Sequence, residues 1–200
     1  STNDEVLKSI GRNHTAQCFF DAVELAKNYP FDINCDVIAG LYGDTEESFK
    51  QTINDVIGLN IESITVHDLC IKKSATLKER NISMTSEIID ECIEYSKNTC
   101  ILNGYLPYYI YRQKNTVGNL ENVGYAKPGS EGLYNIYMME DVHSVFACGA
   151  GGVTKLISKD KEMMRIAFPK YPYEYLDMKN EPEKIDDVFN RITSFFEENN

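Results

Sequence analysis

Two polar side chains interrupt a short apolar segment and could bind a ligand. The segment at residues 31–40 is rich in isoleucine and valine, which predicts a strand. Because side chains alternate across a strand, Asn34 and Asp36 are expected on one face. A carboxylate in an apolar strand is costly unless something compensates its charge. Two interpretations stay open: Asp36 caps a loop or pairs with an arginine, or it faces the interior of a barrel and binds ligand hydroxyl groups near the carboxyl ends of the strands. Arg12, which closes the preceding helix, is a candidate cationic partner.

The elements that would position these residues alternate between helix and strand. Apolar spacing and capping residues predict helices at residues 4–10, 14–28 and 85–103, and a further helix that Thr45 caps. Buried strands are expected at residues 31–40 and 61–70. This alternation is typical of βαβ units, so it predicts a parallel sheet that extends to about residue 111.

The second half of the chain is expected to change character. Residues 105–111 look like an aromatic strand, residues 118–132 like loops, and residues 133–139 and 142–148 like antiparallel strands. A final helix is predicted at residues 182–199, and its apolar face comprises Ile185, Val188, Phe189, Ile192 and Phe196. The predicted fold class is α/β. The latter part of a partial TIM-like barrel is expected at residues 1–104, followed by an α+β extension at residues 105–200.

The composition argues against several classes of function. The 200 residues carry a net charge of −11, which disfavours nucleic acid and anionic membrane surfaces as partners. No apolar window reaches the ~18 residues of a membrane span, and the polar N-terminus is not a secretory signal. The six cysteines and three histidines lack metal-ligand spacing. We therefore expect a cytoplasmic protein with reduced thiols and no metal site, in which the histidines are structural hydrogen-bonding groups.

Three stretches of the sequence together resemble the motifs of one enzyme family. Residues 11–15 read Gly-Arg-Asn-His-Thr, and residues 33–45 read Ile-Asn-Cys-Asp-Val-Ile-Ala-Gly-Leu-Tyr-Gly-Asp-Thr. Residues 109–154 include Tyr-Arg-Gln-Lys-Asn at 111–115 and Gly-Ala-Gly-Gly at 149–152. These stretches resemble the oxygen-independent coproporphyrinogen III oxidases, a family of radical S-adenosylmethionine enzymes, and the third is most similar to the coproporphyrinogen dehydrogenase branch. The turn has Tyr42 where the family has proline.

The family's cluster-binding motif is absent from this sequence. Members of the family hold a [4Fe–4S] cluster with C-x-x-x-C-x-x-C, and no cysteines here have that spacing. The resemblance implies that the chain begins part-way through the barrel, with the cluster motif upstream of Ser1. S-adenosylmethionine and a [4Fe–4S] cluster are the cofactors expected for the intact parent, and the chain alone is expected to be inactive.

The resemblance selects the same two residues as the strand pattern. Asp36 matches the family's ribose-binding carboxylate, and Arg12 matches the arginine near the methionyl carboxylate, contacts that suit a carboxylate and a guanidinium. In the intact parent, a deoxyadenosyl radical would abstract hydrogen from a propionate of coproporphyrinogen III, and loss of carbon dioxide would leave a vinyl group. No catalytic residue is assigned within this chain.

The substrate's four propionates call for cations beside apolar walls. Four basic residues follow the aromatic stretch at residues 105–111 and are candidates for this role: Arg112, Lys114, Lys127 and Lys155. The alternative is that these residues belong to an ordinary solvated surface.

Two other functions stay open under the same resemblance. Relatives of these enzymes are haem-binding chaperones without decarboxylase activity, and a different radical enzyme could reuse the barrel for another substrate. The expected partners are a tetrapyrrole and, for the parent, an electron-donor protein. We also expect the chain to associate with itself, or its N-terminal segment to fold over the edge, because a barrel strand at residues 31–40 without a partner on its N-terminal side would be an open, apolar edge.

Overall fold

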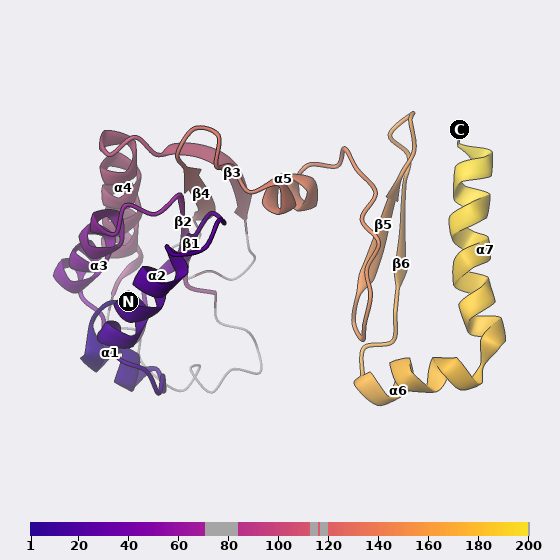
Figure 1. Cartoon of the computed structure of the whole chain (residues 1–200), viewed down its shortest axis with the longest axis horizontal. Helices are drawn as coiled ribbons and strands as arrows, with labels where there is room; N and C mark the ends of the chain where they lie inside the picture. The colour runs from indigo at the N-terminus through magenta and orange to yellow at the C-terminus, as the bar shows by residue number, and fades with distance from the viewer. Residues whose placement is uncertain (71–83, 113–115, 117–119, 200) are drawn as a thin grey trace. The chain divides into compact units, whose positions relative to one another are not determined.

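The computed structural model describes residues 1–70, 84–112, 116 and 120–199. The chain folds as two compact units, Ser1–Gly132 and Leu133–Asn200, each with its own sheet (Figure 1). The boundary expected between residues 104 and 105 falls inside the first unit, because the segments that follow it join the first sheet. Among the described residues, no helix is long and apolar enough to cross a membrane.

The first unit is built on a four-stranded sheet with the order β1-β2-β4-β3. Its elements are α1 (Asp4–Ser9), α2 (Ala16–Ala26), β1 (Asn34–Ala39), α3 (Glu46–Gly58), β2 (Ser63–Asp68), α4 (Ser86–Leu102), β3 (Leu106–Arg112) and β4 (Glu121–Ala126). Strands β1 and β2 are parallel, as the sequence predicts, and α3 connects them. Strand β4 is antiparallel to both of its neighbours, β2 and β3. The sheet is therefore a parallel βαβ arrangement with one antiparallel strand inserted.

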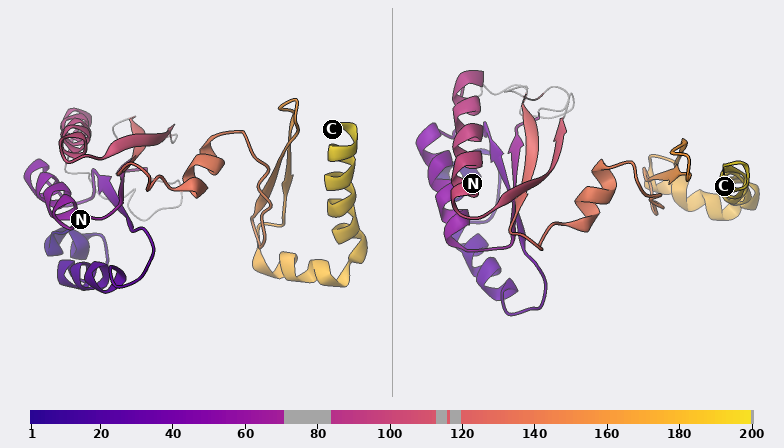
Figure 2. Two further views of the ribbon diagram at one scale, coloured as in Figure 1. Left: turned by 45° about the horizontal axis from the view of Figure 1, so that its top comes forward. Right: turned by 90° about the horizontal axis from the view of Figure 1, so that it is seen from above.

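Helices α3 and α4 lie side by side along one face of this sheet (Figure 2). Each begins where a threonine hydroxyl accepts from a backbone N–H of its first turn, Thr45 for α3 and Thr85 for α4. Between the helices and the sheet lies an apolar core that includes Val37, Ile53 and Ile64. Burying such side chains stabilises a fold by about 1.5–3 kcal/mol each, so this face holds the unit together.

The other face of the sheet carries a different set of side chains, and we call it the Asp36 face. The strand register and the alternation of side chains assign twelve residues to it: Asn34, Asp36, Ile38, Ser63, Thr65, His67, Leu106, Tyr109, Tyr111, Asn122, Gly124 and Ala126. Most of them are polar or aromatic, whereas the helix-covered face of β1 and β2 is mainly apolar. The prediction that Asn34 and Asp36 share one face is confirmed.

Strand β4 occupies residues that the sequence analysis assigned to loops. Its sequence, Glu-Asn-Val-Gly-Tyr-Ala, has a central glycine and few apolar residues, and both features weaken the sequence signal for a strand. The glycine has a packing role instead, because the ring of Tyr109 from β3 lies against Gly124. The expected loop at residues 118–132 is therefore wrong for residues 121–126.

The second unit packs a long helix on a β-hairpin. It comprises α5 (Leu133–Met139), β5 (Val153–Ile157), β6 (Met163–Ala167), α6 (Pro172–Asp177), η2 (Met178–Asn180) and α7 (Pro182–Glu198). Its core joins Leu156 and Ile166 of the hairpin with Phe195 of α7. The final helix is confirmed, but Phe195 is its buried aromatic residue, whereas Phe189 is 63% exposed.

Two strands predicted in this unit are wrong. Residues 133–139 form α5, whose Leu-Tyr-Asn-Ile-Tyr-Met-Met sequence places apolar side chains at helical as well as alternating positions. Residues 142–148 contribute only a single bridge, between Val145 and Lys155. The hairpin forms from β5 and β6 instead, which pair antiparallel over five residues each.

Candidate functional site

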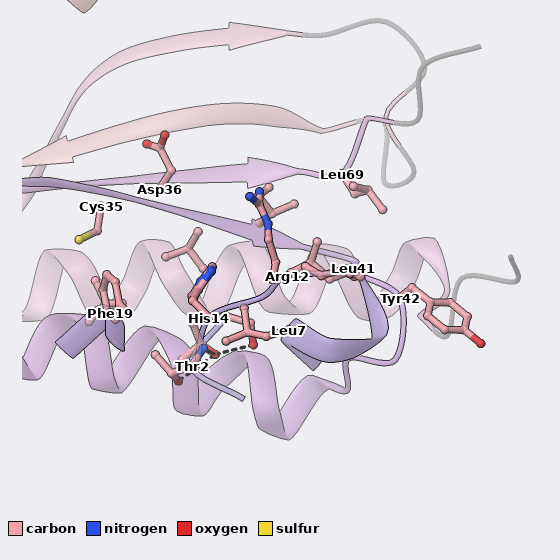
Figure 3. Close-up of a pocket in the computed structure, with 17 residues that line it drawn as sticks. Thr2, Leu7, Arg12, His14, Phe19, Cys35, Asp36, Leu41, Tyr42 and Leu69 are labelled. Carbon is pink, nitrogen blue, oxygen red and sulfur yellow. Dashed lines mark hydrogen bonds between the residues drawn. The ribbon is translucent and has the colours of Figure 1, made fainter. Parts of the chain in front are cut away.

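Asp36 lies in the middle of β1 and projects from the Asp36 face. Figure 3 shows its carboxylate on the opposite side of the strand from the thiol of Cys35, which is buried toward the helices. The Asp36 side chain is 63% exposed although the strand is otherwise largely apolar. The apolar character of the strand comes from its other face, where Cys35, Val37 and Ala39 are buried. An exposed carboxylate on a rigid strand can accept hydrogen bonds from a ligand.

Three neighbours hold Asp36 in its ionised form. Asn34 donates from Nδ2 to Oδ1 of Asp36 at 2.9 Å, and Nε2 of His67 lies 3.7 Å from the same oxygen. Interaction with His67 contributes most to a lowered pKa of the Asp36 carboxyl, and Asn34 and Thr65 lower it further. Partial burial acts in the opposite direction without reversing the effect. The site therefore offers a carboxylate that is charged at neutral pH.

Arg12 lies in the connection between α1 and α2. The turn that follows α1 contains Gly11, whose φ of 77° is readily adopted by glycine, and the backbone N–H of Arg12 donates to the backbone oxygen of Leu7. Thr15 then caps α2, so Arg12 is held between two helix ends. No ion pair joins Arg12 to Asp36 among the described residues. Arg12, one candidate partner of Asp36, is exposed to solvent, whereas Asn34 and His67 lie beside that carboxylate.

Arg12 and Asp36 nevertheless line the same cavity. It has a volume of about 610 Å³, and its walls include Thr2, Arg12, His14, Asp36 and Tyr42 (Figure 3). This volume is within the range of small-molecule sites, about 300–1,000 Å³. The cavity lies between the N-terminal segment and the edge of β1 that faces away from β2. It brings together a carboxylate and a guanidinium, which can bind hydroxyl groups and an anion respectively.

A network of polar and aromatic side chains extends from Asp36 across the Asp36 face. The Asn34 amide oxygen accepts from Ser63 at 2.9 Å and from Thr65 at 3.2 Å. The Tyr109 hydroxyl donates to Thr65 at 3.2 Å. The network thus spans the sheet from β1 to β3.

A second branch of the network reaches Asp36 through an imidazole. The Tyr111 hydroxyl lies 3.3 Å from Nδ1 of His67, whose Nε2 is the atom that faces Asp36. The sequence analysis treated Tyr109 and Tyr111 only as part of an aromatic stretch and His67 as a structural group. Their alternate positions on one strand are the signal that could have placed the two tyrosines on one face with Asp36.

Two of the four basic residues expected near the substrate, Arg112 and Lys127, are described within the first unit, and neither belongs to the Asp36 face. Arg112 ends β3 and is exposed. Lys127 donates from Nζ to the backbone oxygen and the Oδ1 of Asn60 and lies 5.6 Å from the centre of the Tyr105 ring. Lys155 belongs to the second unit and is buried, and Lys114 lies outside the described residues.

Lys155 has a position that explains its burial. Its Nζ lies 3.0 Å from a carboxylate oxygen of Asp141 and 3.4 Å from the backbone oxygens of Tyr137 and Glu140. These oxygens lie at the C-terminal end of α5, where a cation is favourable. In this structure, Lys155 therefore ties α5 to the hairpin.

The cysteines do not form a cluster site. None of the six, all of which lie in the described part of the chain, forms a disulfide, and they are distributed over both units. No group of three histidine, cysteine or acidic side chains that could hold a metal is found among the residues that the structure describes. The residues of this chain therefore do not fit a [4Fe–4S] cluster, which needs converging thiolates.

Comparisons with known proteins agree with the fold. The model of the radical SAM superfamily matches residues 1–56. The chain is 36% identical over 184 residues to the oxygen-independent coproporphyrinogen-III oxidase-like protein HemZ of Bacillus subtilis, an alignment that covers 88% of this chain and 36% of that protein. It is 28% identical over 198 residues to the heme chaperone HemW of Haemophilus influenzae, covering 94% of this chain and 48% of that protein.

A solved structure shows the same fold. Coproporphyrinogen III oxidase HemN from Escherichia coli, a radical SAM enzyme, matches with a TM-score of 0.63 and 18% sequence identity, over 89% of this chain and 41% of that one. The predicted fold, part of a radical SAM barrel followed by an α+β extension, is confirmed by this match. The chain spans less than half the length of each of these proteins.

Proposed function

This chain belongs to the oxygen-independent coproporphyrinogen III oxidase family of radical S-adenosylmethionine proteins, and we propose that it carries the part of the S-adenosylmethionine site that binds the ribose and the methionyl carboxylate. In this proposal, the full-length protein is a cytoplasmic enzyme that decarboxylates the propionates of coproporphyrinogen III in haem biosynthesis. It would receive electrons from a donor protein. The other parts of the site, including the cluster ligands, would come from outside these 200 residues.

The ionised carboxylate of Asp36 is the observation that carries this proposal. It is exposed on a rigid strand, and Asn34 and His67 keep it charged. A carboxylate of this kind can accept hydrogen bonds from two neighbouring hydroxyl groups, which is what a ribose offers. Arg12, on the wall of the same cavity, supplies the guanidinium that a methionyl carboxylate needs.

The two cofactors of the family differ in how they fit this chain. Asp36 and Arg12 fit the polar groups of S-adenosylmethionine, whereas the scattered cysteines do not fit the cluster. When bound together, S-adenosylmethionine and the cluster would supply the radical chemistry. The contribution assigned to Asp36 and Arg12 is to bind and orient the nucleoside.

The test is S-adenosylmethionine binding by full-length protein that carries Asp36→Asn. This change keeps the shape of the side chain and removes its charge. Losing a charged hydrogen bond costs about 1.5–3 kcal/mol, so the dissociation constant should rise roughly 10- to 100-fold. Asp32→Asn, which changes an exposed carboxylate just before β1, is the matched control and should bind like the wild type. Equal affinity of wild type and Asp36→Asn would rule out the assigned role.

A second candidate function is haem transfer. It is favoured by the similarity to two heme chaperones, those of Haemophilus influenzae and Lactococcus lactis, the latter 26% identical over 155 residues that cover 74% of this chain and 38% of that protein. Purified full-length protein can be assayed for both functions. Conversion of coproporphyrinogen III supports the enzyme, and transfer of bound haem to an apoprotein without such conversion supports the chaperone.

A further inference from the structure

His67 lies between Asp36 and Tyr111, with a partner at each ring nitrogen. It belongs to β2, and its side chain is 21% exposed. Nδ1 lies 3.3 Å from the Tyr111 hydroxyl, and Nε2 lies 3.7 Å from Oδ1 of Asp36. The second distance is longer than a hydrogen bond but within the range of an ion pair, so a small rotation of either side chain would close it.

The Tyr111 hydroxyl beside Nδ1 can orient this imidazole and select its tautomer. Burial, with a smaller contribution from the charge of Asp36, raises the pKa of the Tyr111 hydroxyl, which therefore stays protonated and can donate to Nδ1. When Nδ1 accepts, the neutral ring carries its proton on Nε2, the nitrogen that faces Asp36. The imidazole can then donate to the carboxylate without becoming charged.

Tyr111 is itself held by packing on the Asp36 face. Its ring is nearly parallel to that of Tyr109, with an interplanar angle of 6° and centroids 6.3 Å apart, and meets the His67 ring edge-on at 71°. Tyr109 is anchored in turn by its hydroxyl on Thr65. A chain of contacts from β3 to β2 therefore preorganises the imidazole beside β1.

We propose that His67 is a positioning residue that acts through Asp36, holding its Oδ1 so that the other carboxylate oxygen is presented to the hydroxyl groups of a nucleoside. The proposal rests on the assignment of Asp36 to the ribose. Asn34 already donates to the same Oδ1 at 2.9 Å, so the two protein contacts converge on one oxygen. This arrangement orients a carboxylate better than one contact does.

The first test uses the chain itself and no ligand. The pKa of the Asp36 carboxyl, followed by NMR during an acid titration, should rise in His67→Leu relative to the wild type, because the interaction with His67 is the largest cause of its lowering. His67→Gln keeps a donor near the position of Nε2 and should restore most of the lowering. Tyr111→Phe removes only the hydroxyl that orients the ring and should give an intermediate value. An unchanged pKa in His67→Leu would overturn the proposal.

The second test uses full-length protein and S-adenosylhomocysteine as the probe, so that no cluster chemistry is needed. His67→Leu should weaken binding about 10-fold when Asp36 is present. In the Asp36→Asn background it should weaken binding less than about 2-fold, because a residue that acts through another loses its effect when that other residue is changed. Equal weakening in both backgrounds would mean a general structural role and overturn the proposal.

The Asp36→Asn variant distinguishes failure of this proposal from failure of the ribose assignment. If Asp36→Asn alone binds the probe like the wild type, the ribose assignment fails, and this proposal fails with it. If Asp36→Asn weakens binding and the effect of His67→Leu is additive, only the positioning role fails.

Discussion

The ring of Tyr109 occupies the space that a side chain on Gly124 would need, since a Cβ atom at Gly124 would lie 1.9 Å from Cε1 of Tyr109. The two residues are direct neighbours in the β3–β4 register. The absence of a side chain on β4 lets the tyrosine lie over that strand and reach Thr65 on β2. A glycine that looks like a loop residue in the sequence thus shapes the face that carries Asp36.

Gly124→Ala should destabilise the protein by about 1–3 kcal/mol, because the ring is packed and hydrogen-bonded and cannot move aside without losing contacts. Urea unfolding measures the change. The control is Gly58→Ala, at the end of α3, where no neighbouring atom lies within 4 Å of the new methyl group. That variant should be neutral or more stable by up to about 1 kcal/mol. In a Tyr109→Ala background, Gly124→Ala should cost little, and an undiminished cost there would contradict the steric explanation.

The contribution of Asp44 to the free energy of unfolding should decrease as the pH rises from acidic values. It is 1% exposed, and burial raises the pKa of its carboxyl although Thr45 and Ser48 donate to Oδ1. The folded state therefore holds the proton more tightly than the unfolded chain, whose Asp titrates near ~3.9. The resulting stabilisation is complete below that value and is lost as the pH rises through the raised pKa.

Asp44→Asn removes this titration. Urea unfolding of wild type and variant between about pH 3.5 and about pH 7, a range that extends upward from near the pKa of an unfolded Asp, should show the wild type losing stability relative to the variant as the pH increases. The sign of that relative slope is the measurement, because the amide also changes the local hydrogen bonds at every pH. Parallel curves for the two proteins would show that Asp44 has the same pKa in the folded and unfolded states.

The cysteines should differ sharply in reactivity. Burial raises the pKa of Cys35 to about 11 and of Cys92 and Cys100 to about 12, so these thiols carry little thiolate at neutral pH. Cys18 and Cys148 are exposed. A disulfide reagent should therefore modify Cys18 and Cys148 first, and the three buried thiols only as the protein unfolds. Rapid modification of Cys92 in the folded protein would contradict the packing of the first unit.

The same scatter of thiols predicts that the chain alone assembles no stoichiometric [4Fe–4S] cluster. A cluster needs thiolates that converge on one point, and these cysteines do not converge. Anaerobic reconstitution followed by iron and sulfide analysis measures the yield. A full cluster on each chain, lost when any one of the six cysteines is replaced, would show that the chain contains a cluster site of its own.

Local signals were sufficient for the elements with strong periodicity and clear caps. Strands β1 and β2 and helices α3, α4 and α7 lie where apolar spacing and threonine caps predicted them. Elements set by distant partners were missed. Strand β4 depends on the strands at both of its sides and on the ring of Tyr109, and α5 depends on the cation of Lys155 at its C-terminal end.

In the candidate site, too, local sequence patterns predicted some features, and the arrangement of the strands determined the others. Alternation along β1 was enough to place Asn34 and Asp36 on one face. The exposure of Asp36 and its contact with His67 could not be predicted, since both depend on how three strands are arranged in the sheet. Lys127 was chosen for its charge, but charge alone does not distinguish a ligand contact from its bond to Asn60.

The outer edge of β1 should drive self-association. Among the described residues, β1 pairs only with β2, and no backbone hydrogen bond joins it to the N-terminal segment that lies across the cavity. Exposed apolar side chains lie close to its start, where the rings of Tyr29 and Phe31 stack. An unpaired strand edge next to apolar surface recruits another chain, so we expect a dimer or a larger species in sedimentation velocity.

The direction of the backbone groups in β1 identifies a variant that tests this edge. The backbone oxygens of Ile33 and Ala39 are directed to the β2 side, and the intervening even-numbered residues therefore direct their N–H groups to the outer edge. Ile38→Pro removes one outward donor without breaking the ladder with β2, and it should shift the protein toward monomer. Leu102→Ser, which removes an apolar side chain that is 86% exposed on α4, should leave the association unchanged. A wild-type chain that stays monomeric at every concentration tested would show that this edge is not an association surface.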